Sequence, residues 1–195
     1  LEDVVSQSFN RITVDGDTST NDACMLVASG KGIVFEELQA ADQELYLAAV
    51  RELFQELAKD LIRDAEGGTK FITVNVTGGR NAQECLAVAY ALAESPLVKT
   101  ALFASDPNWG RIWAAVGRAE VENLDVSGVS IRLGKLSLIE NGELSASYSE
   151  RQGKKQVDKT DIEISVELGR GGHAETVWTS DLSHDYVRIN AEYRS

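Results

Sequence analysis

Apolar residues recur at two different spacings along the first half of the chain. Between Asp42 and Arg63 they return every three or four positions, which places them along one side of an α-helix. The residues of this repeat are Leu45, Ala49, Leu53, Leu57 and Leu61, with Val50 and Phe54 beside them. Asp42 is a suitable N-terminal cap, and Gly67 and Gly68 release the backbone after the repeat ends. We therefore predict a long helix over residues 42–63.

A two-residue alternation follows this helix. In "FITVNVTGG" (residues 71–79) apolar residues alternate with polar ones, a pattern typical of a half-buried strand. Asn81 and the glutamate three residues later resemble a capping box, which predicts a helix that Pro96 closes. Upstream, "RITV" (11–14) and "CMLVAS" (24–29) have the composition of two short strands joined by a polar loop.

The second half of the chain is predicted to be mostly strand. Asp106 and Pro107 suit the cap and the first position of one further helix, and strand-like alternation begins at Val126. The polar segment "SERQGKKQVDK" (149–159) is most simply a solvated hairpin loop. The final "YVRINAEYRS" (186–195) sends its apolar residues to one side in alternation, which favours a terminal strand.

Composition narrows the class of protein. The 195 residues, 43% of them hydrophobic, are enough for a sizeable core. A net charge of −12 makes nucleic acid and anionic membrane surfaces poor partners. With no leader and no membrane span in the sequence, we expect a soluble, cytoplasmic protein. Cys24 and Cys85 are expected to be reduced, and Leu1 is not expected to be the natural start of the polypeptide.

The polar loop between Val14 and Gly30 raises the question of a metal site. Its polar side chains occupy the first four ligand positions of a calcium-binding EF-hand loop. Thr20 replaces the required glycine, however, and Leu26 replaces the bidentate glutamate, so we expect no metal. Two interpretations stay open: a polar turn that binds its own backbone, or a scaffold that hydrogen bonds a neighbouring active site.

Individual candidate residues give no self-contained catalytic constellation. Glu66 lies beside flexible glycines after the long helix, and on pattern alone a solvated loop glutamate is favoured over a ligand. His173 and His184 are interpreted as surface histidines, because neighbouring strand residues point to opposite faces and cannot form a triad. Any chemistry therefore needs residues from elsewhere.

Three long strings point to a known family. "FNRITVDGDTSTND", "SPLVKTALFASDPNWGRIWAAVGRAE" and "DYVRINAEYRS" together resemble the β chain of the ornithine acetyltransferase (glutamate N-acetyltransferase) family over essentially the whole chain. The resemblance implies a precursor that cleaves itself before a threonine and gives α and β chains, commonly as an α2β2 assembly. That threonine is the nucleophile and is expected upstream of Leu1, so no catalytic residue is assigned in this chain.

The resemblance also implies an α+β fold in two parts. Residues 1–68 would belong to a layered, N-terminal-nucleophile-like α/β sandwich shared with the α chain. Residues 69–195 would form a smaller, mostly-strand C-terminal α+β domain whose tail returns to the active site. The composition changes to mostly strand between about Gly67 and Gly79, which is consistent with this division.

The chemistry implied by the resemblance is acetyl transfer from N-acetylornithine to glutamate through an acetyl-threonine, in arginine biosynthesis and without a cofactor. Glu66, Asn190 and Ser195 match the substrate-binding residues of the family, although the last is usually threonine. The sequence leaves open whether acetyl-CoA is also used. Two alternatives remain: a related self-cleaving aminopeptidase that hydrolyses the acyl intermediate, and a catalytically silent binding subunit.

Overall fold

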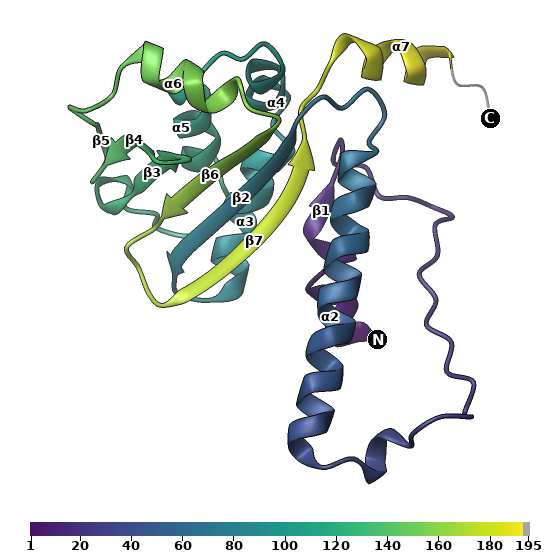
Figure 1. Cartoon of the computed structure of the whole chain (residues 1–195). Helices are drawn as coiled ribbons and strands as arrows, with labels where there is room; N and C mark the ends of the chain where they lie inside the picture. Colours follow the sequence, from purple (N-terminus) through teal and green to yellow (C-terminus); the bar gives the residue numbers. More distant parts are fainter. Residues whose placement is uncertain (193–195) are drawn as a thin grey trace.

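The computed structural model describes residues 1–192 and has a mixed α and β architecture (Figure 1). Within these residues one seven-stranded sheet has the order β1-β7-β2-β6-β3-β4-β5. The strands are β1 Ile12–Thr13, β2 Phe71–Gly79, β3 Ser130–Leu133, β4 Leu136–Glu140, β5 Glu143–Leu144, β6 Asp161–Glu167 and β7 His173–Ser180. The helices are α1 Glu2–Ser6, α2 Ala40–Arg63, α3 Ala82–Ala93, α4 Pro96–Phe103, α5 Trp109–Gly117, α6 Glu150–Val157 and α7 His184–Glu192, with short 3-10 turns η1 Phe9–Arg11, η2 Phe35–Glu37 and η3 Val126–Gly128. The predicted α+β class is confirmed, and the division at residue 68 stays a prediction.

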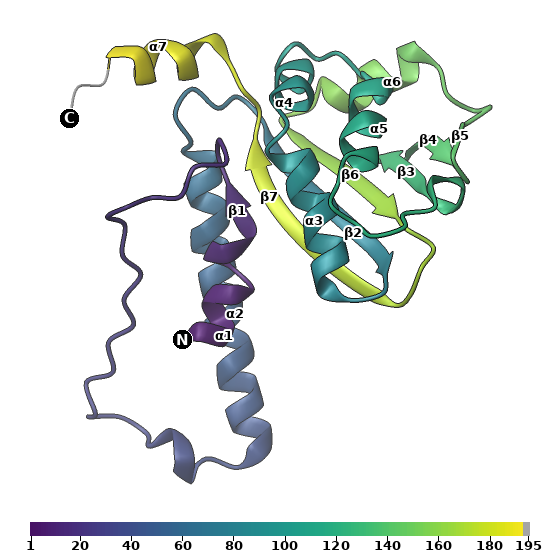
Figure 2. The same cartoon turned by 180° about the vertical axis from the view of Figure 1, so that it is seen from behind.

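The predicted strand at residues 71–79 is the centre of the sheet. It runs parallel to β6 and antiparallel to β7, so β2 is bonded on both edges. Its alternation separates two faces: Val74 and Val76 are buried in the main core, whereas Asn75 lies on the polar face. Helix α3 packs on β2 and β7 from the apolar side, with α5 beside it (Figure 2).

Capping residues, or a proline at the first helical position, mark where three helices begin. Asn81 Oδ1 accepts a hydrogen bond from the Glu84 N–H at 2.9 Å, as the capping pattern predicts for α3. Pro96 follows the end of α3 and is also the first residue of α4, a helix that the pattern did not predict. Asn108, rather than Asp106, caps α5, which therefore begins two residues later than expected.

Three predicted segments differ from the structure. Residues 24–29 are extended and exposed but form no strand, because no described strand lies beside them to pair with. The polar segment 149–159 is not a loop but helix α6, which buries Gly153 and Val157 four residues apart. The final segment is not a strand over 186–192 but helix α7, where Ser183 Oγ accepts from the Tyr186 N–H at 3.2 Å.

Helix α2 confirms the predicted long helix, but its leucine repeat is not the side that packs. Phe54, Ala58 and Ile62 are buried, and Phe54 meets the ring of Phe9 edge-on at 5.8 Å. The leucines of the repeat are instead between 47% and 69% exposed: Leu45, Leu53, Leu57 and Leu61. Figure 1 shows α2 projecting beyond the sheet, with the segment that follows β1 swinging out in a wide loop before it returns to the start of α2.

Helices α3 and α4 also bear on whether the chain enters a membrane. In the described residues no single helix is long and apolar enough to cross a bilayer. The pair formed by α3 and α4 reaches the required length and apolar content, but it bends by 54° at its break. Its apolar residues, including Val88, Leu92 and Leu102, belong to the main core.

Candidate functional site

Two of the predicted substrate-binding residues meet at one end of the molecule. Glu66 lies in the turn after α2, and Asn190 lies in α7. Although they are 124 positions apart, Asn190 Nδ2 donates to Glu66 Oε2 at 2.9 Å and also to the Tyr186 carbonyl at 3.0 Å. Both side chains are exposed. Ser195, the third predicted residue, lies outside the described residues, and the substrate-binding roles stay predictions.

Gly67 lets the turn and the start of α7 approach closely. Its φ is +68°, and a Cβ atom there would lie 2.5 Å from the Tyr186 backbone nitrogen. Ser183 Oγ donates to the Gly67 carbonyl at 2.6 Å, while it also caps α7. Glycine is therefore required on both conformational and steric grounds, and the contact fixes the distance between Glu66 and α7.

The polar opening loop reaches the same place. Tyr186 donates its hydroxyl to Asp15 Oδ2 at 2.8 Å, and the hydrogen bond to this carboxylate, with burial as a second cause, raises the pKa of Tyr186 to about 12. The other Asp15 oxygen accepts from the Asp17 N–H at 2.9 Å, as in a polar turn that binds its own backbone. The loop thus combines a self-bonded turn with one contact to α7, and its role as an active-site scaffold stays a prediction.

A buried carboxylate that sequence reasoning did not single out holds the other side of the turn. Asp181 follows β7 directly and is 2% exposed. Its Oδ1 accepts from the backbone N–H groups of Thr69 at 2.7 Å and Lys70 at 3.0 Å, and its Oδ2 accepts from the Thr69 hydroxyl. No sequence signal connects these partners, because they are more than a hundred positions apart.

Two lysines flank this carboxylate. Lys99, on α4, is buried and donates to Thr179 Oγ1 and to the Ser180 carbonyl. Burial lowers the pKa of Lys99 to about 8, while the negative charge of Asp181 opposes that shift. Lys70 donates to three oxygens, including the Val157 carbonyl at 2.5 Å, and burial lowers its pKa as well. The ammonium groups supply positive charge where the chain buries a carboxylate.

The two histidines make no side-chain hydrogen bond to the turn in the part of the chain that the structure describes. His173 and His184 are both exposed, and the ring of His184 rests edge-on against Phe103 at 5.6 Å. Across residues 1–192, no group of three or more His, Cys, Asp or Glu side chains is placed to hold a metal ion.

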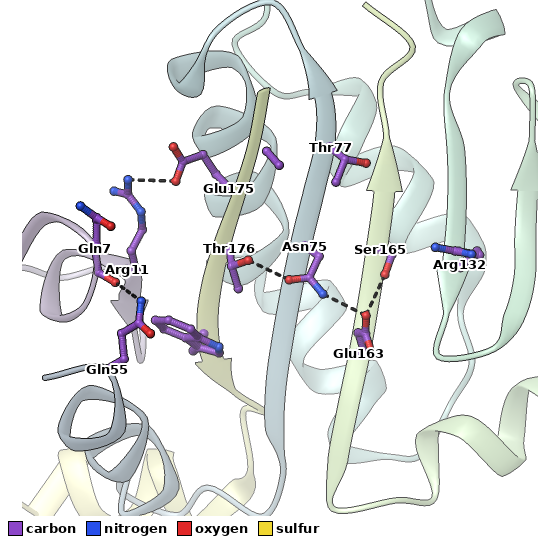
Figure 3. A pocket seen from close by; sticks show the side chains of 12 residues that line it. Gln7, Arg11, Gln55, Asn75, Thr77, Arg132, Glu163, Ser165, Glu175 and Thr176 are labelled. Carbon is purple, nitrogen blue, oxygen red and sulfur yellow. Dashed lines mark hydrogen bonds and ion pairs between the residues drawn. The ribbon is translucent and has the colours of Figure 1, made fainter. Parts of the chain in front are cut away.

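A polar groove of about 590 Å³ lies on the polar face of the sheet, opposite the face that α3 covers (Figure 3). It lies between the N-terminal segment and strands β2, β6 and β7. Asn75 accepts from Thr176 and donates to Glu163, both at 2.9 Å, and Arg11 pairs with Glu175 at 3.0 Å. The polar groups that line the groove therefore largely bind one another. Neither Glu66 nor Asn190 lines it.

The chain thus has a mixed α and β fold. The turn after its long helix carries a carboxylate, Glu66, and its C-terminal helix carries an amide, Asn190, that binds this carboxylate. A model of the ArgJ family matches residues 1–195, and the chain belongs to this family. The predicted resemblance is therefore confirmed.

The relatives are similar over the whole chain. "Arginine biosynthesis bifunctional protein ArgJ" of Pseudomonas fluorescens (strain Pf0-1) is 55% identical over 99% of this chain and 48% of its own length. The proteins of the same name from Pseudomonas syringae pv. tomato and Psychrobacter arcticus are 52% and 51% identical, each over 100% of this chain, and over 49% and 48% of their own lengths. The crystal structure of the Bacillus halodurans ArgJ protein superimposes with a TM-score of 0.89 at 39% identity, over 98% of this chain and 90% of that one. The chain spans about half the length of the curated relatives it matches.

Proposed function

We propose that this chain is the β chain of a two-chain acetyltransferase of arginine biosynthesis, which moves an acetyl group from N-acetylornithine to glutamate. Membership of the ArgJ family supports the pathway, and the names of the relatives support an enzyme with two activities. The chain spans about half of those relatives, which fits a precursor cut into two parts. The observation that carries the site is the 2.9 Å contact between Asn190 and Glu66.

The proposed reaction has two half-reactions on one threonine. The hydroxyl of the threonine expected upstream of Leu1 attacks the acetyl carbonyl of N-acetylornithine while its proton passes to a base. The tetrahedral intermediate collapses, the C–N bond breaks, and ornithine leaves with that proton on its amine. Glutamate then binds and its amine attacks the acetyl ester. The ester C–O bond breaks, and the proton lost by the amine passes through the base to the threonine oxygen, which re-forms the hydroxyl. Donors from the α chain stabilise the oxyanion in both steps.

In this proposal Glu66 binds the ammonium group of the substrate. Asn190 Nδ2 already donates to Oε2 of that carboxylate, which fixes its orientation and leaves Oε1 to accept from the ligand. A charge-assisted hydrogen bond of this kind is stronger than a neutral one. The hydroxyl of Ser195 would bind the substrate as the family's terminal threonine does, without the extra methyl group.

The α chain is the proposed partner of the exposed apolar surface on the N-terminal arm, which we define as residues 1–63. On the arm, Leu53 and Leu57 of α2 are exposed, and so are Met25 and Val27 of the extended segment. Large exposed apolar surfaces of this kind mark interaction sites, since burying them is favourable at roughly 25 cal/mol per Å². The α2β2 assembly is part of the same proposal.

The experiment uses the complete precursor, allowed to mature. Wild type is expected to release ornithine and to form N-acetylglutamate, whereas Glu66→Gln is expected to raise the KM for N-acetylornithine by about 10- to 100-fold, because the ammonium loses its charged acceptor. Glu163→Gln is a matched control, since Glu163 also accepts from an asparagine amide at 2.9 Å but lies on the polar face of the sheet. The control is expected to keep the wild-type KM.

Two results favour the other functions. Release of free acetate in place of N-acetylglutamate indicates a hydrolase of the aminopeptidase type. A precursor that is not cut before a threonine and transfers no acetyl group indicates a silent binding subunit. Equal KM values for Glu66→Gln and Glu163→Gln contradict the proposed role of Glu66.

A further inference from the structure

The turn that carries Glu66 is held from one side by a buried group with no assigned role. Residues 66–69 contain two consecutive glycines, which allow many backbone conformations in the absence of a tether. Asp181 accepts both backbone N–H groups at the end of this turn, from Thr69 and Lys70, and the Thr69 hydroxyl as well. The N-terminal side of the turn is fixed separately, by α2 and by the Gly68 N–H to Ala65 carbonyl bond of 2.9 Å.

The same carboxylate lies at the start of the segment that supplies Asn190. The two positions after Asp181 lead to Ser183, which binds the Gly67 carbonyl and caps α7. Asn190 lies two turns further along that helix. Asp181 therefore joins the end of the turn to the segment that leads into α7, in addition to the direct bond between Ser183 and Gly67.

Buried positive charge holds Asp181 itself in place. Lys99 donates to Thr179 and Ser180, the two residues immediately before it, from helix α4. A buried carboxylate needs such partners, because an uncompensated charge in the interior is costly. Lys99 therefore fixes the chain immediately before Asp181, and the bond from Ser183 to the Gly67 carbonyl fixes it two residues after.

We propose that Asp181 is a positioning residue for substrate binding: by holding Thr69 and Lys70 it keeps the Glu66 carboxylate in register with Asn190. This inference rests on the proposed role of Glu66. It assigns Asp181 no contact with substrate, and its effect on the reaction passes through the turn.

A double-mutant cycle on the mature two-chain enzyme tests the proposal. Asp181→Asn keeps an oxygen for the two N–H groups but loses the second acceptor, and is expected to raise the KM for N-acetylornithine about tenfold with a smaller change in kcat. Asp181→Ala is expected to raise it further, and Thr69→Val, which removes only the hydroxyl, by about threefold. Combined with Glu66→Gln, Asp181→Asn is expected to add little, because the residue through which it acts has already been changed.

A control separates positioning from general loss of stability. Glu84→Gln breaks an ion pair with Arg170 (3.1 Å) near the other end of β7, and is expected to lower the Tm while leaving KM unchanged. The proposal is overturned if Asp181→Asn and Glu66→Gln multiply their effects on KM, or if Glu84→Gln raises KM as much as Asp181→Asn at equal loss of Tm.

Amide hydrogen exchange keeps the test separate from the proposed function. Asp181→Asn is expected to speed exchange at Thr69 and Lys70 relative to Glu84→Gln, whatever the substrate. If wild type transfers no acetyl group, the proposed function fails, and the exchange rates still test whether Asp181 holds the turn. Unchanged exchange at these two amides overturns the inference even in an active enzyme.

Discussion

The two regions of the molecule treat their apolar residues in opposite ways. In the body, residues 71–180, leucines such as Leu138 are fully buried between the sheet and its helices. In the N-terminal arm, Leu57 lies on a regular leucine repeat and is 47% exposed. The body therefore completes its own core, whereas the arm leaves a row of helical leucines exposed. Leucine side chains thus serve folding in one region and, we propose, assembly in the other.

The most severe test of this comparison replaces the same residue type in both regions. Leu138→Ala is expected to lower the free energy of unfolding by about 2–5 kcal/mol, because it leaves a cavity in a closed core. Leu57→Ala is expected to change it by no more than about 0.5 kcal/mol in the chain produced alone, yet to weaken association with the α chain. Denaturant unfolding and analytical ultracentrifugation measure the two effects. Equal destabilisation of the chain alone by both variants would contradict the comparison.

The body differs from the arm in a second way, since it buries charge. Lys99 has a pKa of about 8 in the folded chain against the usual 10.5. Between those values the unfolded chain binds more protons than the folded chain, so the contribution of Lys99 to stability rises as the pH goes from 8 to 10.5. The rise is on the order of 1–3 kcal/mol.

Comparison with Lys99→Met isolates this effect from other titrations. The stability of wild type relative to Lys99→Met is expected to increase over that pH range, as followed by denaturant unfolding at several pH values. Leu138→Ala, which removes no charge, should differ from wild type by the same amount at each pH. A flat difference for Lys99→Met would show that burial does not control this ammonium.

Sequence patterns predicted elements whose signals are local. The helix at 42–63, the strand at 71–79 and the Asn81 cap follow from periodicity and from one side chain close to its partner. Helix α7 was missed because its alternating apolar residues, Val187 and Ile189, are too few to distinguish a strand from a helix. The contacts that decide between the two, such as that of Ser183 with Gly67, are long-range. The periodicity of α2 likewise could not reveal which of its sides is covered, because the residues that bury Phe54, such as Phe9, lie far away in the sequence.

The candidate site was likewise predictable only where its signals are local. Pattern alone favoured a solvated loop for Glu66, and only the family resemblance selected it together with Asn190. Their contact depends on the path of β7 and on the packing of Gly67 against Ser183 and Tyr186, which lie more than a hundred positions from it in the sequence. Nothing in the sequence near Asp181 pointed to its partners, because Thr69 and Lys70 lie more than a hundred positions away.

The junction between the two regions offers a sharper test of the site. Gly67→Ala is expected to cost roughly 1–3 kcal/mol, since the residue has φ of +68° and the added carbon would meet the Tyr186 backbone at 2.5 Å. We also expect the KM for N-acetylornithine to rise, because α7 has to move away from Glu66. Gly32→Ala is the control in the arm: no atom lies within 4 Å of its added carbon. A Gly67→Ala enzyme with wild-type KM would mean that the approach of α7 does not matter for binding.

The smallest expected effect concerns the single side-chain bond between the opening loop and α7. Tyr186→Phe removes the donor to Asp15 (2.8 Å), and because the bond is exposed we expect a loss of no more than about 1 kcal/mol. The loop should nevertheless open more often, since its other side-chain contacts around Asp15 are local: one within the loop and one to the neighbouring Thr13 of β1. Limited proteolysis between residues 15 and 34 measures this opening, and Tyr46→Phe, on the exposed part of α2, serves as the control. Equal cleavage rates in the two variants would show that the bond between Asp15 and Tyr186 does not hold the opening loop against α7, and that the pairing of β1 with β7 and the packing of α2 are sufficient to hold the arm.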